Sequence, residues 1–95
     1  MKSCRLNNIR TLDQLYDELA RQLGFPRHFG RNLDALWDVL TADVEGPLSI
    51  VWEDAEQAQA CLGDDYARVV ALLEEAAAER GDMTLEFSPG GKQPG

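Results

Sequence analysis

The sequence is poor in the residues that build catalytic, metal and redox sites. It has one histidine, His28, and two cysteines, Cys4 and Cys61, which stand far apart and form no CxxC pair. One histidine offers little acid–base capacity, and structural zinc sites need several His and Cys residues at short spacing. The sequence also lacks a Gly-rich phosphate loop and a GxSxG run. It therefore predicts no enzyme, no metal, no cofactor and no disulfide framework.

Long apolar runs are also missing. The N-terminal residues MKSCRLNNIR begin with a basic residue but lack the apolar stretch of a signal peptide, so we expect a cytoplasmic protein with reduced thiols. With 95 residues, 44% hydrophobic and 27% charged, the chain fits one small globular domain. We expect this domain to span residues 1–88 and the Gly- and Pro-rich residues 89–95 to form a disordered tail.

Positive charge is scarce. The chain has 17 Asp and Glu against 9 Lys and Arg, a formal net charge of -8. An acidic surface repels nucleic acid backbones and attracts basic proteins, so direct nucleic acid binding is disfavoured. Acidity also supports solubility, and the charge alone leaves both explanations open.

The spacing of apolar residues predicts an α/β chain with the order strand, two helices, strand, two helices, strand. Residues 3–6 form a weak first strand, and the apolar run 48–52 predicts a central one. The alternation of Met83, Leu85 and Phe87 with polar neighbours predicts a third strand with one buried face. We therefore expect a three-stranded parallel sheet packed with about four helices in a single small domain.

Helix boundaries are marked by capping and breaking residues. A capping box of Thr11 and Gln14 opens the first helix, and the run 24–26, Gly-Phe-Pro, ends it. A short helix over about 54–62 and a longer one closed by Gly81 follow the central strand.

The second helix carries the candidate functional residues. It follows an exposed loop over 26–31, and Asn32 can cap it. Its apolar face holds Leu33, Leu36 and Leu40, and its opposite face holds Asp34, Asp38 and Thr41 at i, i+4 and i+7. Trp37 lies at the border between the two faces, divided between core and interface, whereas Trp52 belongs to the core.

Two acids on one helix face carry a cost. Asp34 and Asp38 are four residues apart and repel by about 0.2 to 0.5 kcal/mol in an isolated helix. A bland explanation is a solvated face on which Arg31 partly offsets Asp34. The loop, helix start, acids and border Trp37 together favour a surface that presents charge and an aromatic anchor to a partner.

Two other functions fit the second helix less well. Glycosidase carboxylates bracket a bond across a cleft, whereas two acids on one convex helix face bracket nothing. An acyl carrier would need an attachment serine, and Ala35 stands at that position in Asp34-Ala35-Leu36.

Residues 25–41, FPRHFGRNLDALWDVLT, closely resemble the barstar family of ribonuclease inhibitors. The family run Gly-x-Asn-Leu-Asp-Ala-Leu-Trp-Asp stands intact over residues 30–38, and the similarity covers nearly the whole chain. The resemblance implies the same three-stranded fold. It also implies inhibition without chemistry, in which the second helix and the loop before it cover a nuclease active site and their acids occupy the positions of RNA phosphates.

The resemblance also assigns roles to single residues. Asp38 matches the central acid of the family and Asp34 a second contacting acid, while Glu75 and the more peripheral Glu79 match acids on the last helix. The implied partner-binding set is His28, Phe29, Asn32, Leu33, Asp34, Trp37, Asp38, Thr41, Ala42, Asp43, Glu75 and Glu79.

The rim of this surface departs from the family pattern. The type member has tyrosine where His28 stands, glycine where Ala42 stands and tryptophan where Asp43 stands. These differences imply either a different ribonuclease of the same broad class or weaker binding to the ribonuclease that the family inhibits. The expected partner is a small, basic, secreted, barnase-like ribonuclease that prefers guanylyl sites, bound one to one by a chain that is a monomer when free, with no membrane partner. The alternative is an interaction module of the same fold that binds another basic protein.

Overall fold

The apolar run Leu48–Trp52 forms β2, the middle strand of the sheet in a computed structural model that describes residues 2–88. It pairs in parallel with β1 (Lys2–Leu6) on one side and with β3 (Met83–Phe87) on the other. The order β1-β2-β3 and the parallel pairing confirm the predicted sheet, with the most apolar strand at its centre.

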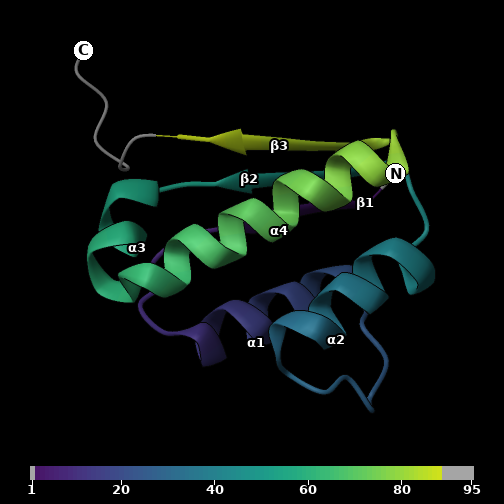
Figure 1. Ribbon diagram of the computed structural model, residues 1–95, viewed down its shortest axis with the longest axis horizontal. Coiled ribbons are helices and arrows are strands. Elements are labelled where there is room, and N and C mark those ends of the chain that lie inside the picture. The colour runs from purple at the N-terminus through teal and green to yellow at the C-terminus, as the bar shows by residue number, and fades with distance from the viewer. Residues whose placement is uncertain (1, 89–95) are drawn as a thin grey trace.

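The sheet has one face turned to the helices and one turned away from them (Figure 1). Strand alternation puts Leu6 and Trp52 on the inner face, where both are fully buried. In the neighbouring register row, Arg5, Val51 and Glu86 lie on the outer face. The predicted burial of Phe87 is wrong: at the last position of β3, its side chain is 40% exposed although its ring stacks on Trp52.

Two helices connect β1 to β2. The first, α1 (Leu12–Leu23), starts at Thr11, whose hydroxyl accepts a hydrogen bond from the Gln14 N–H, and ends at Gly24 in the left-handed region at φ 73°. The Gln14 side chain accepts from the Arg10 N–H rather than from the Thr11 N–H of a full capping box. The second, α2 (Leu33–Asp38), runs directly into a π-helical turn, η1 (Val39–Asp43).

Two further helices connect β2 to β3. The short α3 (Ala55–Leu62) and the long α4 (Asp64–Arg80) are separated by Gly63, and Gly81 ends α4 at φ 80°. Helix α4 crosses the sheet and contacts both α2 and η1 (Figure 1). The predicted number of helices and their order are therefore confirmed. The predicted disordered tail, residues 89–95, lies outside the described residues.

Over residues 2–88, none of the helices is both long enough and apolar enough to cross a membrane.

The two cysteines are expected to react very differently. Cys4 is 1% exposed on β1, and burial together with the charge of Glu18 raises its pKa to about 12, whereas Cys61 is exposed on α3. A disulfide reagent at pH 8 should therefore label Cys61 in the native protein and Cys4 only after denaturant is added, as mass spectrometry would show. Rapid native labelling of Cys4 would contradict its burial.

The raised pKa of the Cys4 thiol leads us to expect that the protein loses stability at alkaline pH. The folded state raises the Cys4 pKa from 9.0 to about 12, so it favours the neutral thiol. Its contribution to the free energy of unfolding is complete below pH 9 and is lost as the pH rises toward 12.

Candidate functional site

The loop before α2 is held against α1 by aromatic packing. The Phe29 ring meets the rings of Tyr16 and Phe25 edge to face, at centroid distances of 5.6 and 5.0 Å. Phe29 is half-buried and packs on the core. Two residues of this loop are predicted to contact a partner. Phe29 packs on the core side of the loop and fixes it to α1, whereas the neighbouring His28 is exposed.

Arg31 ties the loop to α1 through charge. Its guanidinium donates to the Asp17 carboxylate at 2.8 Å and to the Asp13 carboxylate at 3.3 Å, and it lies over the Tyr16 ring. The structure does not support the alternative explanation in which Arg31 partly offsets Asp34, because the arginine pairs with acids of α1. The charge of Asp34 is thus left for another partner.

Helix α2 starts where the sequence predicts. Asn32 has extended backbone geometry, and its side-chain oxygen accepts from the Ala35 N–H at 2.7 Å. This bond satisfies one of the N–H groups that every helix start leaves free. Because α2 has only six residues, its orientation depends on this cap and on the packing of the fully buried Leu36.

Replacing Asn32 by alanine should lower the free energy of unfolding by about 1 kcal/mol, since the cap is lost. Asn32→Asp keeps an acceptor oxygen and should be close to neutral in urea unfolding experiments. Equal losses in both variants would show that the amide group of Asn32, rather than its capping oxygen, stabilises α2.

The end of this helix differs from the prediction. The sequence favours a regular helix through Thr41, but the Val44 N–H donates to the Val39 carbonyl at 3.0 Å, the five-residue spacing of a π-turn. The Thr41 hydroxyl donates to the Trp37 carbonyl at 2.7 Å, so this half-buried side chain bonds its own helix. Ala42 and Asp43, which follow it in η1, are both exposed.

Five exposed acids lie on two packed helices and on the π-turn that follows the first of them. Asp34, Asp38 and Asp43 are exposed on α2 and η1, and Glu75 and Glu79 are exposed one turn apart on α4. Every ion pair formed within residues 2–88 uses other acids. Since α4 contacts both α2 and η1, these carboxylates form a negative surface, called here the acidic face.

An open groove of about 440 Å³ separates α2 from α4 within this face. Leu33, Asp34 and Trp37 line it from α2, and Glu75 lines it from α4. Trp37 is half-buried, packed on the core and bordering the groove. A groove with an aromatic wall and a carboxylate on each side suits a cationic side chain of a protein partner.

Three groove residues were missed by the sequence analysis: Arg68, Ala71 and Leu72. Together with Glu75 they follow the 68, 71, 72, 75 spacing of one helix face, which is the signal that could have found them. Arg68 pairs with Asp65 along its own helix at 3.3 Å, so it leaves Asp34 and Glu75 unpaired.

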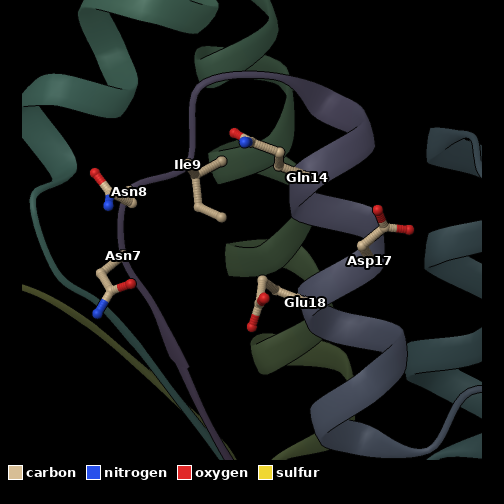
Figure 2. A pocket seen from close by; sticks show the side chains of 6 residues that line it. All are labelled: Asn7, Asn8, Ile9, Gln14, Asp17 and Glu18. Carbon is tan, nitrogen blue, oxygen red and sulfur yellow. The ribbon is translucent and has the colours of Figure 1, made fainter.

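A second hollow, of about 280 Å³, lies elsewhere, between the turn after β1 and α1, as Figure 2 shows. Three of its polar side chains already have partners: Gln14 accepts from the Arg10 N–H, Asp17 pairs with Arg31, and Glu18 accepts from Gln22 and Arg21. These bonds hold the pKa of Glu18 below its usual value. The hollow therefore has few free groups with which to recognise a ligand, and residues 2–88 hold no cluster of metal ligands.

Two comparisons with known proteins identify relatives of this chain. Residues 1–88 match the family described as "Barstar (barnase inhibitor)". The chain is 39% identical over 75 residues to the protein named "Putative ribonuclease inhibitor YrdF" of Bacillus subtilis (strain 168), an alignment that covers 79% of this chain and 82% of that protein. The match spans the sheet, the helices and the acidic face, and the chain belongs to the barstar family.

Proposed function

We propose that this protein inhibits a barnase-like ribonuclease by covering its active site with the acidic face. The observation that carries the proposal is the set of exposed carboxylates on α2, η1 and α4 that have no ion-pair partner within residues 2–88. Like charges gathered on two packed helices are unfavourable in the free protein, and a cationic partner relieves that repulsion. Membership of the barstar family supports a nuclease as that partner.

In the proposed mechanism, carboxylates replace RNA phosphates. A ribonuclease active site holds cationic side chains that bind the substrate backbone, and a carboxylate can accept the same charge-assisted hydrogen bonds. Asp38 is the central acid, and Asp34 and Glu75 bind a second cation across the groove next to Trp37. No bond is made or broken, and the inhibitor acts by excluding RNA.

The rim of the acidic face sets the choice of nuclease. His28 is exposed in the loop, and Ala42 and Asp43 are exposed on η1. Rim charges act mainly on the rate of association and on the rejection of wrong partners. The partner is a small, basic, secreted ribonuclease that prefers guanylyl sites, bound one to one by a monomeric inhibitor in the cytoplasm.

A titration tests this function. The protein is added in steps to a small bacterial ribonuclease that prefers guanylyl sites, and RNA cleavage is followed. A sharp endpoint at one inhibitor per enzyme supports the proposal. Unimpeded cleavage by a panel of such nucleases overturns it.

A second function is favoured by the changed rim. His28 and Asp43 replace the aromatic residues of the family's type member, which suits a binding module for a basic protein other than a ribonuclease. The same titration separates the two functions, because only an inhibitor removes RNA cleavage stoichiometrically.

A further inference from the structure

The π-turn at the end of the contact helix leaves one backbone acceptor for a distant side chain. In a regular α-helix the Leu40 carbonyl would accept from the Val44 N–H, but that N–H is donated to Val39. The Arg80 guanidinium instead donates to the Leu40 carbonyl at 2.9 Å, across 40 positions of the chain. The last residue of α4 thus supplies the hydrogen bond that this carbonyl would otherwise lack.

Arg80 is well fixed for this contact. Its side chain is only 8% exposed, and it forms a two-pronged ion pair with Asp82, at 2.8 Å from Nε and 3.2 Å from Nη2. Its hydrogen bonds hold the pKa of Asp82 below the usual value. A planar guanidinium held on one edge by a carboxylate has its remaining N–H groups aimed in one direction.

The same group also packs on the chain that leaves η1. A Cβ atom added to Gly46 would overlap both Arg80 Nη2 and the Asp82 carboxylate. Arg80 therefore touches the polypeptide before the end of the π-turn, at Leu40, and after it, at Gly46.

We propose that Arg80 is a positioning residue that locks η1 to α4 and so fixes Asp43 of the acidic face relative to Glu75 and Glu79. Thr41 and Ala42, the other η1 residues of the implied partner-binding set, are held in place with Asp43. The binding part of this inference rests on the proposed function. A preorganised surface loses less conformational entropy when it binds, so loss of the lock increases the dissociation rate.

The first test needs no partner. Amide hydrogen exchange is measured by NMR for Arg80→Ala, Arg80→Lys and Arg21→Ala, the last of which removes an exposed arginine paired with Glu18 on α1. The Val44 amide should exchange at least tenfold faster in Arg80→Ala, while the Leu36 amide, bonded to the Asn32 carbonyl, reports on α2 and stays unchanged. Unchanged exchange at Val44 overturns the proposal, and so does an equal increase in Arg21→Ala.

The second test measures dissociation from the inhibited nuclease. Arg80→Ala should dissociate about tenfold faster than the unaltered protein. The dissociation rate of Arg80→Lys should lie between the two, because an ammonium group can reach one acceptor but cannot bind Asp82 and Leu40 together as the guanidinium does. If the alanine variant does not fold, the lysine variant is measured in its place. Faster exchange at Val44 with unchanged dissociation would overturn the proposal. If the unaltered protein inhibits no nuclease, the proposed function fails, while the exchange result still decides whether Arg80 orders η1.

Discussion

An Asp38→Ala variant is expected to bind its ribonuclease more weakly by about 2 to 5 kcal/mol, a 30-fold to several thousand-fold rise in Kd. Asp38 is exposed on α2 and has no ion-pair partner in the described part of the free chain, so its charge is available to the nuclease. Truncation leaves the cations of the active site buried without a counter-charge, which costs more than the lost contact alone. The inhibition constant should rise mainly through faster dissociation.

Two further variants separate charge from shape. Asp38→Asn keeps the size of the side chain and should lose most of the same binding energy, because the amide carries no charge. Glu86→Ala removes one negative charge from the outer face of the sheet and should bind like the parent. Circular dichroism and urea unfolding should show all three variants folded. An Asp38→Ala variant that is folded and still inhibits at parental strength would contradict the proposed mechanism.

Much of the fold could be predicted because local sequence and global structure agree. The apolar run Leu48–Trp52 predicts a central strand, and it is one. Helix starts at Thr11 and Asn32 and helix ends at Gly24 and Gly81 follow capping rules that act within a few residues. Such features are decided by neighbours in the sequence, and the structure has all of them.

The errors concern features decided by distant residues. The burial of Phe87 depends on which other parts of the chain cover the end of β3, and alternation within the strand cannot show that. At the π-turn Val39–Asp43, the Leu40 carbonyl accepts a hydrogen bond from Arg80, which lies at the far end of α4, 40 positions along the chain. The alternative explanation that paired Arg31 with its neighbour Asp34 likewise could not be judged from the sequence, because the acids that bind Arg31 lie on α1.

The candidate site was predictable in unequal parts. Asp34, Asp38 and Trp37 could be found from the spacing of one helix. The contribution of Glu75 came only from the resemblance, because nothing in the spacing of α4 shows that it packs beside α2. The groove that joins Glu75 to Asp34 is a property of helix packing, and it needed the structure.

Salt is expected to slow association with the nuclease by about 100-fold between about 10 mM and 500 mM ionic strength. The chain carries a formal net charge of -8, and the exposed carboxylates of the acidic face take part in no ion pair within residues 2–88. At low salt the field of such a surface extends about 30 Å and can raise association rates from about 10⁵ to 10⁶ toward 10⁸ M⁻¹s⁻¹ or more. Stopped-flow measurements of association over a range of salt concentrations would give this dependence.

Association and dissociation rates should respond differently to substitutions at the centre of the acidic face and at its rim. Asp43 is exposed on η1 at the rim, so Asp43→Ala should reduce the association rate and flatten its salt dependence while dissociation stays close to parental. Asp38→Ala should do the reverse, because a central carboxylate opposite several cations acts after docking. If both variants changed association alone, the acids would only steer the encounter, and the substitution of RNA phosphates by carboxylates would lose its support. An inhibitor that covers an active site should show these opposite effects of Asp43→Ala and Asp38→Ala. Charge at the edge of the contact surface speeds association, whereas charge at its centre slows dissociation.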